Sequence, residues 1–415
     1  MSLKFTALEI GSGDAFLLED GDRKILFDAG GSQDLIVRLL KKKKIKKIDL
    51  AICSHNDKDH SNGFLGLLKS DIAIDEIWLP ANWASILHSI KHDPYCFMEL
   101  FCHFGYFNRK YHELEGREIK LYSEEYVPVD SFQEELTFFE NEDLEYYCAM
   151  MEEYYKDHQY RGEAEEWEMI KNNYYRNKKQ FPRHFNDESC RFNDGTPDFC
   201  KKNCAHKQWC WRYHEYTATD ILINLEKIIE IARAAHKKSP KIKWFEPIKS
   251  CCQNKVDYGF VALNSIKSHR IKEIDHHPLA FLCALYTITL TKENEYSLVF
   301  EFHKSDIPVV RFSADSDSTC QSKKPYCDNI IVTAPHHGSE ANKGVYGAID
   351  NDNVIWVRSD RKISTRPCKE YKTRKERYCL ACKHRKPSRK EICFEYDESK
   401  KQWICNSGER CVCQP

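Results

Sequence analysis

The chain has 415 residues, which is enough for two or three domains with full hydrophobic cores. Its formal net charge is -1, so the overall charge favours neither nucleic acid nor a membrane surface as a partner. No run of about 18 or more apolar residues occurs, and the first residues lack the pattern of an export signal. We therefore expect a cytoplasmic protein with no membrane partner, in which the 20 cysteines serve as metal ligands or buried thiols.

Charge is concentrated in two regions of the chain. Residues 124–170 carry sixteen Asp or Glu against two Lys or Arg, whereas residues 358–390 carry fourteen basic residues against three acidic ones. A basic stretch of this kind can follow a phosphate backbone. It can equally be a solvated face, or the partner of the acidic block within the same chain.

The first 80 residues read as short strands and helices in alternation. Apolar patterning predicts strands at residues 3–10, 15–18, 24–27, 48–53 and 76–79, and helices at residues 34–40 and 62–68. Residues from about 85 to 215 are rich in Tyr, Phe, Glu and Cys, with little strand alternation, and predict an inserted, mostly helical subdomain.

Regular patterning returns near residue 221. A helix is expected at residues 222–235, and strands at residues 241–245, 281–290, 297–302, 308–313 and 329–334. The chain ends in a basic, cysteine-rich tail, in which residues 391–396 and 402–405 could pair as a hairpin.

The densest group of reactive side chains is Ser54-His55-Asn56-Asp57-Lys58-Asp59-His60. Two imidazoles and two carboxylates follow a predicted buried strand and precede a predicted helix. A two-metal hydrolytic site needs this density, because two cations about 3.5–4 Å apart share a water and lower its pKa. The alternative is a charged surface loop, but the whole constellation favours metal.

This loop resembles the metallo-β-lactamase fold superfamily, whose usual signature is His-x-His-x-Asp-His. Asp57 replaces the second His here, a variant similar to the hydrolase domain of the bacterial competence protein ComEC family. Further segments resemble that family in the same order: residues 10–15, 26–31, 75–80, 294–299, 312–315 and 335–339. The resemblance implies an α/β fold, the αββα sandwich, split between residues 1–85 and 216–357. Residues 86–215 would be a large, mostly helical, cysteine-containing insertion, and residues 358–415 a basic, cysteine-rich extension.

The resemblance also implies the ligands of two divalent metals. One metal would take His55 and Asp57, the other would take Asp59 and His60, and Asp315 would bridge both. His336 or His337 would complete the second site. Asp28 would orient a ligand imidazole from behind. Asp14 lies in a turn that can approach the site or simply bond local amides.

One ligand that the superfamily usually supplies has no match in this chain. It is a His midway between the two motifs, and Asn294 and Ser297 occupy that neighbourhood; His276, His277 and His303 are the candidates to replace it. Three Asp ligands favour harder ions, so manganese is expected beside zinc.

The resemblance implies a metal-dependent hydrolase, most readily a phosphodiesterase or nuclease that acts on nucleic acid or a nucleotide. Asp59 or Asp315 would hold a metal-bound hydroxide, and His336 or His337 would protonate the leaving oxygen. A hydrolase of small esters, amides or cyclic nucleotides is the alternative, because an acidic insertion would repel long polyanions. A catalytically degenerate interaction module is a third possibility, and the insertion could bind protein partners.

A second candidate metal site lies in the predicted insertion. Four thiols occur close together in the sequence, at Cys190, Cys200, Cys204 and Cys210. This density suits a structural zinc or, less readily, an iron–sulfur cluster. Reduced, partly buried thiols are the alternative.

Overall fold

The computed structural model describes residues 2–102, 104–113, 121–136, 207–239, 241–248, 253–289, 296–317, 328–349, 352–360, 366–380, 391–408 and 410–413. Cys190, Cys200 and Cys204 of the predicted zinc site lie outside the described residues, as do the side chain of Cys210 and most of the acidic block. The structural zinc therefore stays a prediction.

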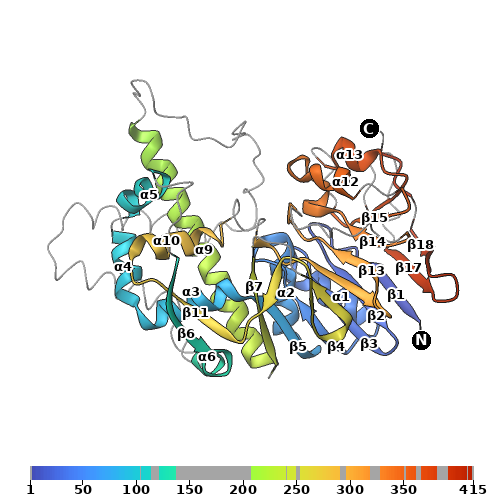
Figure 1. Cartoon of the computed structure of the whole chain (residues 1–415), viewed down its shortest axis with the longest axis horizontal. Helices are drawn as coiled ribbons and strands as arrows, with labels where there is room; N and C mark the ends of the chain where they lie inside the picture. The colour runs from blue at the N-terminus through green and yellow to red at the C-terminus, as the bar shows by residue number, and fades with distance from the viewer. Residues whose placement is uncertain are drawn as a thin grey trace.

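Two β-sheets packed face to face form the main body of the protein (Figure 1). Over the described ranges, the larger sheet has nine strands in the order β10 (Ser265–Lys267), β7 (Ile242–Pro247), β5 (Ala73–Pro80), β4 (Lys47–Ile52), β3 (Arg23–Phe27), β2 (Phe16–Asp20), β1 (Leu3–Ala7), β17 (Ile392–Asp397) and β18 (Gln402–Ser407). The smaller sheet has seven, in the order β16 (Glu376–Cys379), β15 (Ile355–Arg358), β14 (Ile331–Thr333), β13 (Ile307–Phe312), β12 (Phe300–Lys304), β9 (Phe260–Ala262) and β8 (Asn254–Lys255).

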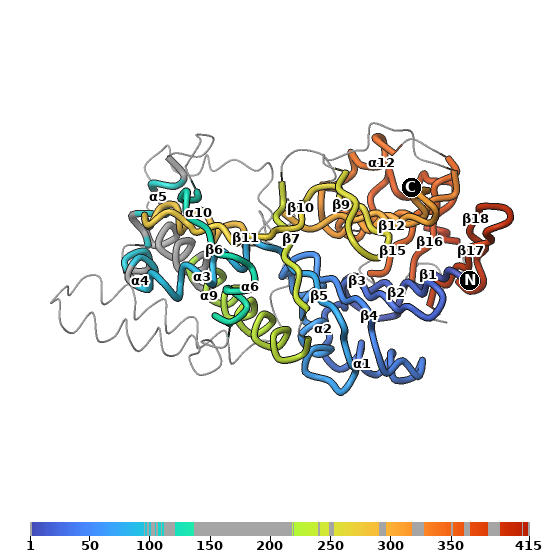
Figure 2. Tube along the Cα trace, turned by 60° about the horizontal axis from the view of Figure 1, so that its bottom comes forward, coloured from blue at the N-terminus to red at the C-terminus, as the bar shows by residue number. Residues whose placement is uncertain are grey.

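Helices cover the outer face of each sheet, so the body has four layers (Figure 2). The larger sheet carries α1 (Gln33–Lys42), α2 (Lys58–Lys69) and α9 (Lys207–Lys238). The smaller sheet carries α12 (Gly344–Ala348) and α13 (Lys369–Lys372). This mixed α/β arrangement is consistent with the αββα sandwich that the sequence predicts.

Strand alternation explains why the layers form. Phe16 and Leu18 of β2 point into the core between the sheets, whereas Leu17 between them points toward the helices. Phe312 of β13 lies at the centre of the inter-sheet core and stacks on Phe27 of β3 at a centroid distance of 4.6 Å. Such aromatic pairs hold the two sheets together.

The C-terminal extension is part of both sheets. β16 adds to the smaller sheet parallel to β15, and β17 pairs antiparallel with β1 at the edge of the larger sheet. The structure confirms the predicted hairpin, which is β17 paired with β18. Trp403 of β18 also donates a hydrogen bond of 3.0 Å from Nε1 to the carbonyl of Val309 in the other sheet.

A subdomain of helices and a small two-stranded sheet projects from one end of the larger sheet (Figure 1). Its described parts are α3 (Ala81–His92), α4 (Pro94–Cys102), α5 (Phe104–Glu113), β6 (Tyr122–Pro128), α6 (Val129–Glu135), β11 (Arg270–Ile274) and α10 (Pro278–Tyr286). β6 pairs antiparallel with β11, a strand that follows β10 in the chain. Helices α3 and α9 run through the predicted boundaries at residues 85 and 215, and the domain division itself stays a prediction.

The strand predicted at residues 281–290 is wrong. Most of this segment belongs to helix α10, which begins at Pro278 and has His277 as its N-cap. The segment is almost wholly apolar because it is buried, so it shows neither strand nor helical periodicity. The cap and the proline at the first helical position were the available signals.

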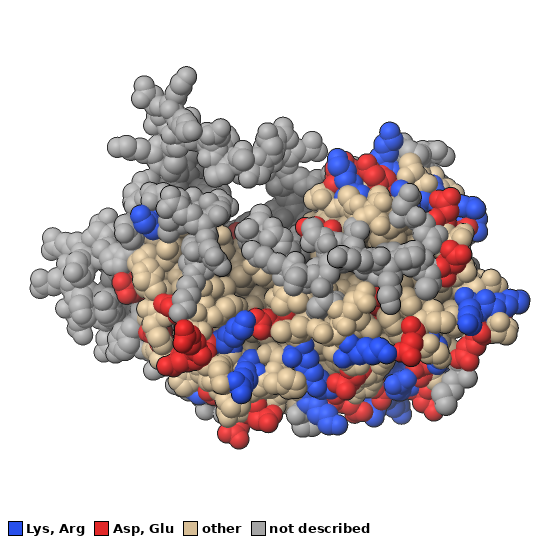
Figure 3. Space-filling view, viewed as in Figure 1, with Lys and Arg blue, Asp and Glu red and all other residues tan. Residues whose placement is uncertain are grey.

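The described surface shows mixed charge. Lys and Arg side chains alternate with Asp and Glu over the face seen in Figure 3. Among the described residues, no helix is long and apolar enough to cross a membrane.

We predict that Phe312→Ala lowers the free energy of unfolding by about 3–5 kcal/mol, because it leaves a cavity in the inter-sheet core. Urea denaturation followed by tryptophan fluorescence measures this. Ile404→Ala, at a side chain that is 43% exposed, is the control and should change the free energy by only about 0.5 kcal/mol or less. Equal effects of the two substitutions would contradict the assigned core.

Candidate metal centre

The candidate ligands meet at one edge of the two facing sheets, where several strands end. Asp28 follows β3, and the loop with His55 follows β4. Asp315 follows β13, and the two-histidine turn, Pro335–Gly338, follows β14. Asp14 reaches the same place from the turn that joins β1 to β2. Residues far apart in the sequence therefore converge because the strand ends are adjacent.

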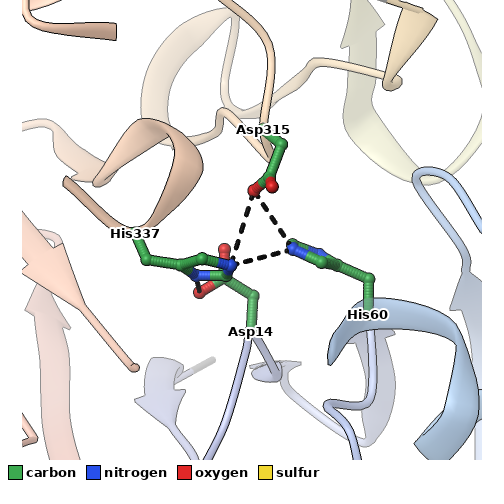
Figure 4. Close-up of side chains that lie close together, drawn as sticks. All are labelled: Asp14, His60, Asp315 and His337. Atoms are coloured by element: carbon green, nitrogen blue, oxygen red, sulfur yellow. Dashed lines mark hydrogen bonds and ion pairs between the residues drawn. The ribbon is translucent and has the colours of Figure 1, made fainter. Parts of the chain in front are cut away.

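Two imidazoles, His60 and His337, face each other across the centre of this site (Figure 4). Nδ1 of His60 donates to Asp28 at 2.8 Å, and Nδ1 of His337 donates to Asp14 at 3.0 Å. Since a carboxylate only accepts, these contacts place a proton on each Nδ1. Both Nε2 atoms then point inward and lie 3.2 Å apart.

Two carboxylates complete a ring of electron-pair donors around the same point. Asp315 Oδ1 lies 3.1 Å from Nε2 of His60 and 3.6 Å from Nε2 of His337. Asp59 Oδ2 lies 3.2 Å from Nε2 of His337. Ligands about 2.0–2.1 Å from a tetrahedral zinc lie about 3.3 Å from one another, so these separations fit a cation of that size.

The buried carboxylate of Asp315 supports this reading. Its side chain is 1% exposed, and neither of its oxygens accepts a well-aligned hydrogen bond. Leaving buried charged oxygens in this state is costly unless a cation neutralises them. One proton could sit between the two facing imidazoles, but a divalent cation would satisfy all four groups at once. The residues present therefore fit a bound metal.

A second group shares Asp315. Ligand atoms of His55, Asp57 and Asp315 lie within 4.8 Å of one another. Ser54 donates its hydroxyl proton to Asp28 at 2.7 Å and lies 2.8 Å from Nδ1 of His55, so Nδ1 of His55 carries the proton. Nε2 of His55 is buried without a hydrogen-bond partner, 3.8 Å from Asp315 Oδ2. Asp315 thus lies where the predicted bridging ligand would be.

The electrostatics of the site follow from burial and from these contacts. Burial, with the nearby charge of His60, lowers the pKa of His55 to about 3. Burial, with the carboxylates of Asp59 and Asp315, raises the pKa of Asp57 to about 6. Burial opposes the charge on His337, but the carboxylates of Asp14, Asp315 and Asp59 outweigh it and raise its pKa to about 10.

Strained backbone surrounds the centre. Asp28, Ala314, His336 and His337 all have positive φ, between 46° and 54°. Each such conformation costs about 1–3 kcal/mol for a residue with a side chain. Strain gathered on residues that hold a ligand or adjoin one is typical of a functional site.

Close backbone packing fixes the turn that carries Asp14. A Cβ added to Gly13, which has a φ of +87°, would lie 1.6 Å from the carbonyl oxygen of Asp59. The amide of Asp14 donates to that same carbonyl at 3.2 Å. The turn therefore holds the orienting carboxylate and the ligand loop in one rigid unit.

Sequence reasoning missed the support that the end of β15 gives to this site. Arg358, the first residue of the basic stretch at residues 358–390, is buried and donates from Nε to the carbonyl of His337 at 2.7 Å. The hydroxyl of Ser359 donates to the carbonyl of Gly13 at 2.8 Å and also contacts Asp14. Arg358 Nη2 pairs with Asp360 at 3.3 Å. No short sequence motif marks these three residues.

His336 lies beside the centre with a different environment. Its Nε2 is 3.5 Å from Asp315 Oδ2 and accepts a hydrogen bond of 2.9 Å from Arg366. Its Nδ1 lies 3.2 Å from Oδ1 of Asn342. Burial, opposed by Asp315 and reinforced by Arg366, lowers its pKa. The side chain is 18% exposed, so His336 lies between the buried ligands and solvent.

The candidates for the missing His lie elsewhere. His276 is 58% exposed and pairs with Asp93. His277 caps α10, and His303 lies 3.3 Å from Glu301. Within the described residues, none of the three joins the ligand groups around Asp315. Ser339, at the end of the two-histidine turn, accepts a hydrogen bond from the amide of Ala341 as an N-cap does.

We predict that zinc affinity rises with pH between about pH 6 and pH 8, by up to about tenfold per pH unit for each proton displaced. Burial lowers the pKa of His60 and of His337, but the neighbouring carboxylates outweigh burial, so the pKa of both imidazoles is raised. A metal must therefore displace a proton from each imidazole that it binds. Competition titration of metal-free protein against a chromophoric chelator measures this. An affinity independent of pH, after correction for the chelator, would exclude these imidazoles as ligands.

We predict that Gly13→Ala lowers the metal content, because the added Cβ displaces the Asp59 carbonyl and the turn that carries Asp14. Gly347→Ala is the matched control, since a Cβ there meets nothing within 4 Å. Metal content by plasma mass spectrometry, with circular dichroism to verify folding, compares the two. Normal metal content in Gly13→Ala would refute the role of this close approach.

Comparison with known sequences agrees with this geometry. No curated protein matches the chain. The sequence model of the metallo-β-lactamase superfamily matches residues 8–75. That segment contains Asp14, Asp28 and the loop from His55 to His60, which supply half of the centre. Residues 8–75 are thus similar to the metallo-β-lactamase superfamily, whose members are generally metal-dependent hydrolases. The cluster of His and Asp side chains is able to hold a divalent metal of the kind that such enzymes use.

Proposed function

We propose that this protein is a phosphodiesterase, most readily a nuclease, that uses two divalent metals held on either side of Asp315. One observation carries the proposal. The buried Asp315 carboxylate belongs to two groups of possible ligand atoms, one with Asp14, His60 and His337 and the other with His55 and Asp57. Asp59 adds a carboxylate oxygen 3.2 Å from Nε2 of His337. Paired metals would polarise a phosphoryl oxygen and supply an activated water at neutral pH.

The residues of the chain would perform three tasks. Asp28 and Asp14 hold His60 and His337 in the tautomer that presents Nε2 inward. Asp59, which is less buried than the imidazoles, would orient the attacking water. His336 would accept at Nε2 the proton that the attacking water releases and pass it to the leaving oxygen, because both nitrogens of His337 are already engaged by the centre and by Asp14.

A phosphate anion needs a cation outside the metal ligands, and Arg366 is suited to this. Its guanidinium lies beside His336 and is 17% exposed, close to the ligands but not among them. A guanidinium can bind two phosphate oxygens at once. When it turns to the substrate, it would release Nε2 of His336 for proton transfer. This arrangement favours a phosphodiester over a neutral ester.

The finer features of the proposal follow the same chemistry. Oxygen ligands from three Asp residues favour manganese beside zinc. A nucleic acid or nucleotide is the proposed substrate, and the likeness to the ComEC hydrolase domain belongs to this proposal. Protein partners would bind through the insertion. We propose that the reaction takes place in the cytoplasm, a reducing compartment in which thiols persist.

We predict that the purified chain with Mn²⁺ or Zn²⁺ cleaves labelled single- or double-stranded DNA or RNA. Asp59→Asn should lower the rate by about 10²-fold or more, because it weakens the positioning of the attacking water. Asp306→Asn, at an exposed residue paired with Lys255, is the matched control and should retain the parental rate. Gel analysis of end-labelled substrates measures both.

The outcomes separate the alternatives. Cleavage of small esters, amides or cyclic nucleotides without cleavage of any nucleic acid would replace the nuclease proposal with the small-substrate hydrolase. Metal bound at the centre without hydrolysis of any substrate would favour a degenerate interaction module.

A further inference from the structure

A second cluster of metal-type ligands lies in the subdomain, away from the candidate centre. His88 and His92 are four residues apart on α3, so their side chains share one face of the helix. Glu135 lies at the C-terminal end of α6 and reaches both rings. The ligand atoms of the three residues lie within 4.8 Å of one another. Nothing in the proposed reaction uses them.

The distances within the cluster are close to those of a metal site. Glu135 Oε2 lies 2.9 Å from Nδ1 of His88, and Oε1 lies 3.2 Å from Nε2 of His92. Zinc with bonds of about 2.0–2.1 Å would hold its ligand atoms about 3.3 Å apart, which is close to these two nitrogen–oxygen distances. The two imidazole centroids are 4.4 Å apart.

The surroundings of His88 resemble those of a ligating imidazole. The ring is 4% exposed, and its other nitrogen, Nε2, lies 4.0 Å from Glu273 Oε1 on β11. Metal-bound imidazoles commonly direct the second nitrogen at a carboxylate, which fixes the ring. In this arrangement Nδ1 of His88 would face the metal and Nε2–H would face Glu273.

The local charge also favours a cation. The carboxylates of Glu135 and Glu273 lie on two sides of His88, and Asp93 pairs with the neighbouring His276. Lys91 lies 3.8 Å from Glu135 Oε2, and His276 contacts Asp93 and Glu273. This lysine and this third imidazole at the edge offset only part of the negative charge.

We propose that His88, His92 and Glu135 bind a zinc ion that fixes α6 and β11 against α3. The side chain of His92 is 43% exposed, so water would take the fourth position. The metal would brace the subdomain where it meets the main body, because α3 directly follows β5 of the larger sheet. This site is independent of the proposed phosphodiesterase activity.

The test compares zinc bound per chain in the full-length parent, His92→Ala and Glu135→Gln, measured by plasma mass spectrometry after gel filtration. His276→Ala is the matched control, because it removes a neighbouring imidazole that is not a proposed ligand. We expect His92→Ala and Glu135→Gln each to lose about one zinc per chain relative to the parent. His276→Ala should keep the parental content. Zinc should also raise the thermal midpoint less in His92→Ala than in the parent.

Equal zinc content in the parent, His92→Ala and Glu135→Gln would overturn the proposal. Loss of the same zinc in His276→Ala would also overturn it, because the effect would then come from general disruption of the cluster. Asp315→Ala provides the separation from the main centre. The double variant Asp315→Ala and His92→Ala should lose the sum of the metal lost by the two single variants. Loss of metal from one site should leave the metal content of the other site unchanged.

Discussion

The site depends on a buried carboxylate, Asp315, held among imidazole nitrogens whose protons point outward. Asp28 and Asp14 take the Nδ1 protons of His60 and His337, so both rings present Nε2 to the same point. Ser54 places the proton of His55 on Nδ1 in the same way, because its hydroxyl donates to Asp28 and therefore accepts from His55. The lone pairs of these Nε2 atoms and of the Asp315 carboxylate lie close together in a buried space, where only a proton or a metal cation can stabilise them. Asp315 is where the two ligand groups meet.

Strained backbone and close packing in the scaffold maintain this arrangement. Left-handed backbone at Asp28, Ala314, His336 and His337 turns each loop sharply at a strand end. The inter-sheet core around Phe312 and Phe27 keeps those strand ends in register. Arg358 and Ser359, from the end of β15, then bind the backbone of the two-histidine turn and of the Gly13 turn. The stability of the core thereby supports the geometry of the ligands.

The subdomain and the C-terminal extension are tied closely to the main body. β17 lies beside β1, and β16 continues the smaller sheet, so the extension completes both sheets. The turn that follows α10 reaches the ligand loop itself, since the side-chain amide of Asn56 donates to the carbonyl of Ile288 at 3.2 Å. Lys227 of α9 donates to the carbonyl of Asn56 at 2.8 Å. Elements outside residues 8–75 therefore shape the loop that holds His55 and Asp57.

The sequence by itself determined most of the local elements and predicted most of the candidate ligands. Alternating apolar residues predicted β1 to β5, and the density of His and Asp after β4 marked the ligand loop, because both signals are short-range. The same reasoning failed for α10, where complete burial removes the periodicity.

Only the tertiary structure decided which distant residues meet. It paired Asp14 with His337, which are 323 positions apart in the sequence. It also placed His336 against Arg366, whereas both nitrogens of His337 are engaged within the centre. Ser359 was brought to the Gly13 turn. It also brought Glu135 to the histidines of α3. Such contacts depend on the order and register of strands in two sheets, which no local pattern encodes.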